Sequence, residues 1–141
     1  MDSFVYDRFE ITEILHRHQI AIDERDGDAY AALFTPDGRF ESPFASAAGT
    51  AEIKQMTLGL HESGFTEDKR HYLGPLRVEL EGQRARAISY WWVADTADPP
   101  RVFATGRYVD EFTKTSTGWR IAHRVQEADQ APSNDDPVTG S

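Results

Sequence analysis

Residues 69–80, KRHYLGPLRVEL, decide the fold expected for this chain of 141 residues. The second half of the stretch alternates apolar Leu76, Val78 and Leu80 with polar residues, which is the period of a half-buried β-strand. The first half contains His71, whose side chain can take or give a proton near neutral pH. A histidine at the start of such a strand is held by the sheet, so a reactive side chain and a structural element meet in one stretch.

The chain that follows this stretch is predicted to continue as strands joined by short turns. The expected strands cover residues 76–81, 84–96, 101–114 and 119–126. Because the connections are short, neighbouring strands are expected to pair antiparallel in a curved meander. Residues 128–141 are polar with almost nothing apolar, so we expect a disordered acidic tail after a single domain at residues 1–127.

Helices are predicted in the part of the chain before this stretch. A first helix is expected from Asp2 or Ser3 to about Asp26, because apolar residues and one histidine repeat at helical spacing: Ile11, Ile14, Leu15, His18 and Ile22. Residues 28–34 and 50–64 are expected to be helical as well. Between them lie a turn at 35–38, a brief strand at 39–42 and a loop at 45–49. Helices followed by a long antiparallel sheet make an α+β domain, and helices closing a curved sheet leave an interior pocket.

Composition argues against several functional classes. The formal net charge is −9 and the isoelectric point is near 4.9, which is the wrong sign for binding nucleic acid or an anionic membrane. The chain has no cysteine, so a disulfide, a thiol nucleophile and a cysteine-built metal site are excluded. No apolar run reaches 18 residues and the start MDSFVYDRFE is too polar for a signal peptide, so we expect a cytoplasmic protein.

Metal and cofactor motifs are not found in the sequence. His16 and His18 are two apart on a helix and point in different directions, and His61 and His71 lack a second ligand at helical spacing. There is no glycine-rich phosphate loop and no G-x-S-x-G nucleophile motif. We therefore expect no metal and no cofactor, which leaves acid–base chemistry by side chains.

One acid–base pair suggested by the residues is Asp23 with His71. A carboxylate that accepts from one imidazole nitrogen fixes the tautomer and supports the imidazolium formed at the other. The alternative for Asp23 is a solvated charge beside Arg25, and the 48-residue separation does not decide between them. Arg107 or Arg124 could stabilise developing negative charge, or form a surface salt bridge. Four aromatic residues line a pocket or only fill the core: Tyr6, Tyr72, Trp91 and Tyr108.

Four segments resemble the SnoaL-like branch of the nuclear-transport-factor-2-like (NTF2-like) superfamily. They are AIDERDGDAYAALFTPDGRF (21–40), RHYLGPLRVELEGQRARAISY (70–90), GRYVDEF (106–112) and GWRIAHRV (118–125). The resemblance implies an α+β cone, in which a curved, mostly antiparallel sheet wraps N-terminal helices around an interior pocket. Members of this superfamily include dehydratases, isomerases, polyketide cyclases and non-enzymatic binders, so the resemblance fixes the fold far more than the function.

Within this branch the chain is most similar to gamma-hexachlorocyclohexane dehydrochlorinase, and more distantly to scytalone dehydratase. The resemblance places the catalytic aspartate and histidine of that enzyme on Asp23 and His71, and its leaving-group arginine on Arg124. A lysine of that site falls on His18 and an indole falls on Phe40, which are two departures. Because the leaving-group side differs, elimination or isomerisation is expected rather than dehydrochlorination of that substrate.

The resemblance implies a lyase or isomerase without a cofactor, in which His71 removes a proton from carbon and Asp23 supports the imidazolium. The expected substrate is a small hydrophobic cyclic molecule, bound by His18, Phe40, Tyr6, Trp91 and Tyr108. A homodimer or homotrimer is implied as well. Polyketide cyclisation is an alternative, and so is a non-catalytic binding module or an accessory subunit such as the small subunit of a ring-hydroxylating dioxygenase.

Overall fold

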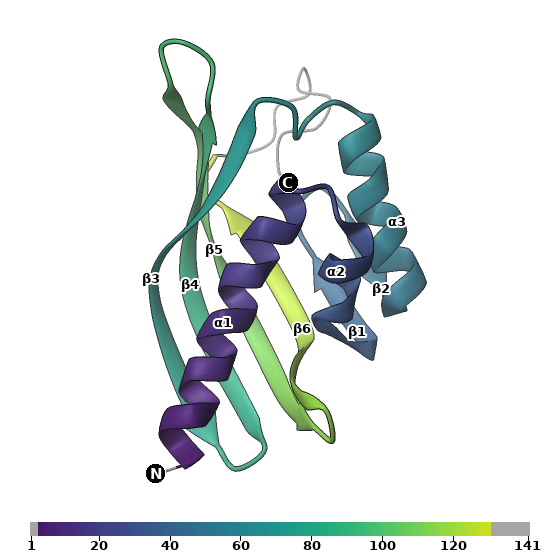
Figure 1. The fold of residues 1–141 in the computed structure, drawn as a ribbon, viewed down its shortest axis with the longest axis vertical. Helices are drawn as coiled ribbons and strands as arrows, with labels where there is room; N and C mark the ends of the chain where they lie inside the picture. Colours follow the sequence, from purple (N-terminus) through teal and green to yellow (C-terminus); the bar gives the residue numbers. More distant parts are fainter. Residues whose placement is uncertain (1–2, 131–141) are drawn as a thin grey trace.

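The computed structural model describes residues 3–130, in which three helices lie against one face of a six-stranded sheet (Figure 1). The elements follow in the order α1 (Ser3–Asp23), α2 (Gly27–Ala32), β1 (Phe34–Glu41), β2 (Ser46–Ala48), α3 (Gly49–Glu62), β3 (Lys69–Glu81), β4 (Arg84–Asp95), β5 (Arg101–Thr115) and β6 (Gly118–Ala128). The predicted α+β cone is confirmed. The predicted tail begins at the last residue of β6, and from residue 131 it lies outside the described residues.

The strand order in the sheet is β2-β1-β6-β5-β4-β3. β3 to β6 form the predicted antiparallel meander, with pairs such as His71 opposite Val93 and Asp110 opposite Arg124. β1 departs from that pattern because it pairs parallel to β6, which sets Phe40 opposite Arg124. The N-terminal half of the chain therefore supplies one edge of the sheet as well as the helices that cover it.

Irregularities in the strand register bend the sheet. Pairing shifts between Leu73 and Leu76 in β3, between Val93 and Ala94 in β4, and between Glu111 and Phe112 in β5. A bulge of this kind bends its strand and increases the local twist. The long strands therefore curve around α1, which crosses the concave face of the sheet (Figure 1).

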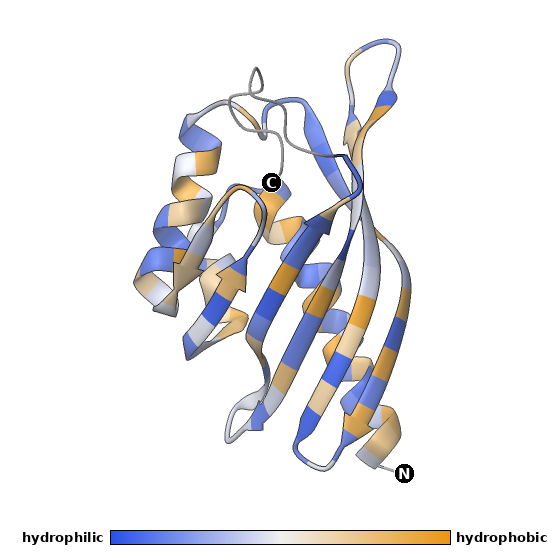
Figure 2. Cartoon of the chain, turned by 180° about the vertical axis from the view of Figure 1, so that it is seen from behind, coloured by the Kyte–Doolittle hydropathy of each residue, from blue (hydrophilic) through white to orange (hydrophobic). Residues whose placement is uncertain are grey.

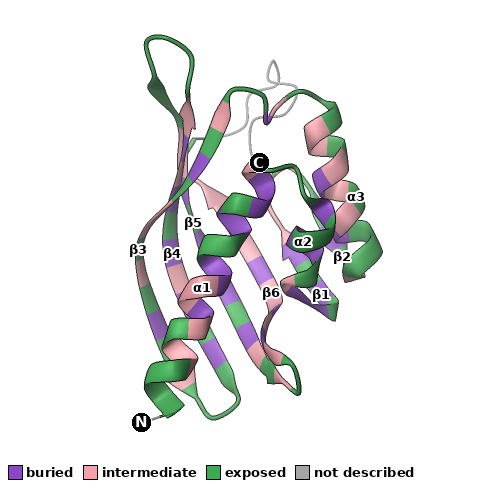
Figure 3. Ribbon diagram, viewed as in Figure 1, coloured by how far each residue is buried: buried purple, intermediate pink, exposed green. Residues whose placement is uncertain are grey.

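The core lies between α1 and this concave face. The predicted stripe of α1 is buried as a set, comprising Ile11, Ile14, Leu15, His18 and Ile22. It meets alternate residues of the strands, so buried and exposed positions alternate along β4 and β5 (Figure 3). Each fully buried aliphatic side chain contributes about 1.5–3 kcal/mol. Hydropathy alternates in the same way on the strands seen from behind (Figure 2).

Local boundaries differ from the expected ones at three places. α1 ends at Asp23 rather than near Asp26, because Asp26 caps α2 by accepting a hydrogen bond from the Ala29 N–H. The predicted turn at 35–38 is an irregular part of β1, where a Cβ on Gly38 would lie only 2.9 Å from the main-chain oxygen of Thr35 and 3.2 Å from that of Ile121. The expected loop at 45–49 contains the short strand β2. Within residues 3–130, no helix combines the length and hydropathy needed to span a bilayer.

Candidate functional site

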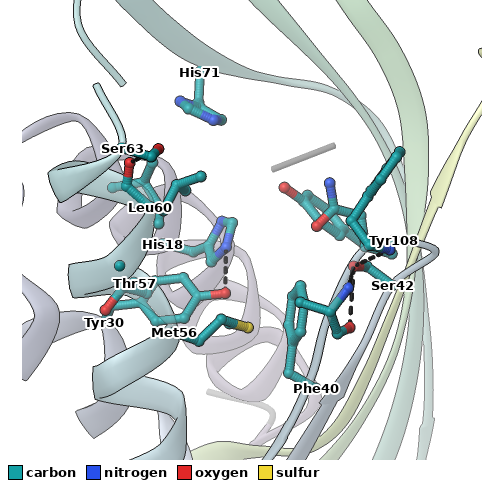
Figure 4. A pocket seen from close by; sticks show the side chains of 15 residues that line it. His18, Tyr30, Phe40, Ser42, Met56, Thr57, Leu60, Ser63, His71 and Tyr108 are labelled. Carbon is teal, nitrogen blue, oxygen red and sulfur yellow. Dashed lines mark hydrogen bonds between the residues drawn. The ribbon is translucent and has the colours of Figure 1, made fainter. Parts of the chain in front are cut away.

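A cavity of about 220 Å³ opens between the helices and the concave face of the sheet (Figure 4). All three helices contribute to its wall, together with β1, β3, β5 and β6 and the loop after β1. The lining residues are mostly apolar or neutral: His18, Ile22, Tyr30, Phe40, Ser42, Phe44, Ala45, Met56, Thr57, Gly59, Leu60, Ser63, His71, Tyr108 and Gln126. Its volume is below the 300–1,000 Å³ typical of pockets for drug-sized ligands, so it suits a small molecule.

Asp23 and His71 meet at one end of this cavity. The Asp23 Oδ1 accepts a hydrogen bond from Nδ1 of His71 at 2.9 Å. The main-chain N–H of His71 donates to the same carboxylate, at 3.0 Å to Oδ1 and 3.1 Å to Oδ2. The side chain of Asp23, the last residue of α1, thereby binds both the main chain and the side chain of His71 near the start of β3.

This geometry sets the tautomer of His71. An ionised carboxylate can only accept hydrogen bonds, so the nitrogen facing Asp23 carries the proton and Nε2 keeps its lone pair. Nε2 is buried and has no hydrogen-bond partner among residues 3–130. The imidazole is 2 % exposed whereas the carboxylate is 22 % exposed, so water reaches Asp23 more readily than the ring. A buried, unpartnered acceptor held beside a cavity is the arrangement expected of a general base.

His18 lines the cavity as predicted, but both of its ring nitrogens already have partners. Nδ1 lies 2.7 Å from Oε1 of Gln19, and Nε2 lies 3.2 Å from the hydroxyl of Tyr30 (Figure 4). Gln19 also donates to the main-chain carbonyl of Tyr72 in β3, which orients its amide. Burial, with the nearby Arg124 and His71, lowers the pKa of His18 well below its usual value. His18 is therefore neutral and does not supply the positive charge that a lysine would supply there.

Arg124 lies behind the cavity wall rather than in it, which corrects the prediction that it lines the pocket. Its Nε and Nη2 donate to the two carboxylate oxygens of Asp110 at 2.7 and 2.9 Å. Both side chains are fully buried, and the guanidinium carbon lies 4.1 Å from the centre of the Tyr108 ring. A guanidinium cannot remain buried without a carboxylate partner, and β5 and β6 supply that partner at paired positions.

Two other predicted binding residues lie away from the cavity. Tyr6 is 60 % exposed in the first turns of α1. Trp91 is buried, but its indole packs over Gly106 of β5 and against the Tyr108 ring, with centroids 5.9 Å apart. Because Gly106 has no side chain, the indole fills that space instead of reaching the cavity. Phe40 and Tyr108 do line the cavity, as predicted.

Three residues of the site were not singled out from the sequence: Gln19, Tyr30 and Asp110. Asp110 did carry a signal, since a carboxylate stands among inward-facing apolar residues in the alternating pattern of β5. Gln19 and Tyr30 gave no comparable signal, because polar residues on a helix are usually solvated. Over the same described range, no group of three or more histidine or acidic side chains is arranged to hold a metal ion.

Comparisons with known proteins agree with this architecture. A family model described as a SnoaL-like domain matches residues 4–125. An uncharacterized protein of Mycobacterium bovis is 31 % identical over 129 residues, which cover 86 % of this chain and 85 % of that protein. An NTF2-like protein with a cystatin-like fold from Novosphingobium aromaticivorans superposes with a TM-score of 0.85 at 27 % identity, covering 93 % of this chain and 87 % of that one.

Two further solved structures are similar to this chain. A protein of Catenulispora acidiphila, solved in complex with S-DNPA, is 26 % identical with a TM-score of 0.76, covering 91 % of this chain and 96 % of that one. The beta subunit of a putative aromatic-ring-hydroxylating dioxygenase from Novosphingobium aromaticivorans has the same TM-score over 99 % of both chains, at 16 % identity. The second likeness shows a shared fold alone.

Proposed function

The chain belongs to the SnoaL-like domain family, and on that premise we propose that it is an acid–base enzyme in which His71 removes a proton from carbon. The observation that carries the proposal is the buried, unpartnered Nε2 of His71 beside the cavity, with Nδ1 held by Asp23. Elimination, isomerisation and cyclisation all begin with such a step. The reaction class is therefore a lyase or an isomerase, with polyketide cyclisation as an alternative outcome of the same step.

The proposed step transfers one proton from a substrate carbon to Nε2 of His71 and leaves the electron pair of the C–H bond on the substrate. The substrate C–H bond breaks, an Nε2–H bond forms, and the electron pair stays on the substrate as a new π bond while a leaving group departs or an enolate forms. The imidazolium that results is opposite the Asp23 carboxylate, 2.9 Å from Nδ1. Attraction between the negative carboxylate and the positive imidazolium across that hydrogen bond stabilises the protonated histidine.

The substrate class follows from the cavity wall. Apolar side chains make up most of the wall, including Ile22, Phe40, Met56 and Leu60. Small apolar sites of this kind bind ring compounds by burial of surface. A similar protein of Catenulispora acidiphila binds S-DNPA, which supports a small-molecule ligand for this cavity. We propose a hydrophobic cyclic substrate of one or two rings.

The experiment uses 5-nitrobenzisoxazole, a small flat probe whose ring opens when a base removes its C–H proton. The C–H and N–O bonds break, a nitrile forms, and the released phenolate is followed by its colour. His71→Ala is expected to lower turnover by about 10²–10⁴-fold. His16→Ala, an exposed histidine of the same helix as Asp23, is the control and should leave turnover unchanged. Equal turnover in wild type and His71→Ala would refute the proposal.

A non-catalytic accessory subunit is the alternative function. The dioxygenase beta subunit shares the fold, although 16 % identity says nothing about role. A binding module has no need of a buried imidazole nitrogen without a partner, and leaving one unsatisfied costs about 1–3 kcal/mol. That cost favours the enzyme. Wild-type protein that leaves the probe unchanged, yet co-purifies with a large oxygenase subunit, would establish the alternative.

We also propose that the outer face of the sheet joins copies of this chain. Tyr72 stacks on Trp92 there, with ring centroids 4.2 Å apart, and Tyr90 is 54 % exposed beside Arg107. Exposed aromatic residues with arginine are typical of protein interfaces. Light scattering should give the mass of a dimer or trimer, and Tyr90→Glu should shift it toward the monomer. A monomeric wild-type protein at high concentration would contradict the proposal.

A further inference from the structure

We propose that the Tyr108 hydroxyl donates the hydrogen bond that holds the substrate's oxygen, and that the substrate is therefore an uncharged compound with a carbonyl group. The inference rests on the proposed function for the identity of the base, but it concerns the opposite wall of the cavity. His71 projects from β3 and Tyr108 from β5, and Figure 4 shows them on different sides of the space.

Most polar side chains of the cavity wall already have partners. The hydroxyl of Tyr30 lies against Nε2 of His18, and Nδ1 of His18 is bonded to Gln19. The hydroxyls of three other lining residues donate to main-chain carbonyls: Ser42 to Ala45, Thr57 to Lys54 and Ser63 to Leu60. Gln126 has a partner of its own.

The hydroxyl of Tyr108 remains. No hydrogen bond joins it to another residue of the range 3–130, and it is not among the buried polar atoms, so it is open to the cavity although the residue as a whole is only 2 % exposed. Burial raises the pKa of Tyr108, so the phenol keeps its proton at neutral pH and acts as a donor. A hydroxyl that is open to a cavity and has no partner in the protein is free to donate its hydrogen bond to a ligand oxygen.

The ring of Tyr108 is held rigidly. Arg124 lies over one face, His18 meets the ring edge-on with centroids 5.2 Å apart, and Trp91 packs beside it at 5.9 Å. Asp110 in turn fixes Arg124 through two hydrogen bonds. A cation over the ring withdraws electron density from the phenol and strengthens its O–H as a donor. Arg124 is therefore a positioning residue that acts through Tyr108, without touching the substrate.

The charge of the ligand follows from the same wall. None of the fifteen lining residues is Asp, Glu, Lys or Arg, and His18 is held neutral. A carboxylate or phosphate ligand would lose its hydration in the cavity without gaining a counter-ion, which costs several kcal/mol. An uncharged carbonyl oxygen loses little and gains the bond to Tyr108. The site therefore selects neutral carbonyl compounds over their acidic analogues.

In the reaction, Tyr108 stabilises the negative charge that develops on the substrate oxygen, and it does not transfer its own proton. When His71 takes the proton next to the carbonyl, the electron pair moves into a C=C bond and negative charge appears on the oxygen. Tyr108 keeps its proton, and its hydrogen bond to that oxygen strengthens. Return of the proton from His71 Nε2 to a carbon, or loss of a leaving group, completes the step. Removing one such donor typically lowers turnover by about 10²–10³-fold.

The test uses 1-indanone, an uncharged two-ring ketone, and measures the infrared stretch of its carbonyl when bound. A hydrogen bond to the oxygen lowers the stretching frequency, so wild type should give a lower value than Tyr108→Phe. Tyr30→Phe is the matched control and should give the wild-type frequency, because the Tyr30 hydroxyl lies against His18. His71→Ala should also keep the lowered frequency. If His71→Ala still turns over 5-nitrobenzisoxazole, the proposed base is refuted, whereas the proposed role of Tyr108 is not affected.

Binding measurements test the proposal in a second way. In wild type, 1-indanone should bind more tightly than indane, which lacks the oxygen, and more tightly than indane-1-carboxylate. In Tyr108→Phe the preference for 1-indanone over indane should shrink by about tenfold, the value of one neutral hydrogen bond. Three results would overturn the proposal: the same carbonyl frequency in wild type and Tyr108→Phe, no binding of 1-indanone to wild type, or tighter binding of the carboxylate.

Discussion

Asp23 accepts hydrogen bonds from both the main-chain N–H and the imidazole Nδ1 of His71, at N···O distances of 2.9–3.1 Å. One carboxylate thus fixes the strand and the ring together. The main-chain bond holds β3 against the end of α1, so the ring cannot leave Asp23 without the strand moving as well. The relationship explains how a residue at a helix terminus can orient an imidazole 48 residues away.

Asp23→Asn is expected to change the tautomer of His71. An asparagine can accept with only one of its two terminal atoms, and its amide can donate to Nδ1 and move the proton to Nε2. Turnover should fall by about 10⁴-fold, as for the analogous change in a catalytic triad. Long-range ¹⁵N–¹H correlation spectra of the histidine ring should show the proton on Nδ1 in wild type and on Nε2 in the variant.

The double variant Asp23→Asn/His71→Ala is the companion to that experiment. Its turnover should be little lower than that of either single variant, because residues that act as a unit are not additive. Thermal melts should show Asp23→Asn folded and equally or slightly more stable, since a partly desolvated carboxylate is costly. Losses that multiply in the double variant would mean that the two residues act independently.

His18 should make the folded protein sensitive to mild acid. Burial lowers its pKa well below the 6.5 of a free histidine, so below pH 6.5 the unfolded chain binds a proton that the folded chain does not. Stability should therefore fall as the pH drops from about 6.5 toward 5, by up to ~1.4 kcal/mol per pH unit for one such group. His61 adds in the same direction, because burial lowers its pKa too.

Urea unfolding at several pH values measures this effect. His18→Asn should flatten the dependence between pH 6.5 and 5, and His61 should account for part of the remaining slope. His16→Asn, on an exposed position of the same helix, should leave the slope as it is in wild type. A wild-type stability that stays constant over this interval would contradict a neutral, buried His18.

The Arg124–Asp110 pair should be essential as a pair and dispensable as a whole. Arg124→Met leaves Asp110 buried without a counter-ion, which is expected to cost about 3–5 kcal/mol of unfolding free energy. Replacing both residues, as in Arg124→Met/Asp110→Leu, should recover most of that loss. Urea unfolding with unchanged m-values would show it. A single variant as stable as wild type would show that the pair is not sealed from water.

The strands and the buried stripe of α1 were predictable from sequence because they depend on local periodicity. Alternation around Val78 and helical spacing around Leu15 report directly which face is buried. β1 was harder to predict, since its parallel pairing with β6 depends on a close approach at Gly38 that no local pattern shows. Tertiary contact decided the boundaries there.

The candidate site, too, was predictable only in part. The resemblance to SnoaL-like proteins gave Asp23 and His71, and the structure brings them to hydrogen-bond distance. It could not show that Arg124 faces Asp110 behind the wall, because both residues project from strands whose register sets the contact. Nor could it show that Gly106 gives Trp91 room to turn away from the cavity. Such contacts depend on which strands pair and in which register, and sequence periodicity determines neither.

Gly106→Ala is predicted to damage the wall behind the cavity. A Cβ at this position would collide with the main-chain oxygen of Glu127 and with the indole of Trp91. Neither the backbone of β6 nor a buried indole can move freely, so the cost should reach at least the ~1–3 kcal/mol typical of overpacking. Displacing Trp91 also releases one side of Tyr108, so binding of 1-indanone should weaken more than binding of indane.

The control for this last change is Gly59→Ala in α3. Gly59 is exposed, and a Cβ there meets no atom within 4 Å. Alanine has the higher helix propensity, so this variant should gain roughly 0.5–1 kcal/mol. Urea unfolding of the two variants should therefore move in opposite directions. A Gly106→Ala protein as stable as wild type, with an unchanged preference for the ketone, would mean that the packing of Trp91 on β5 does not support Tyr108.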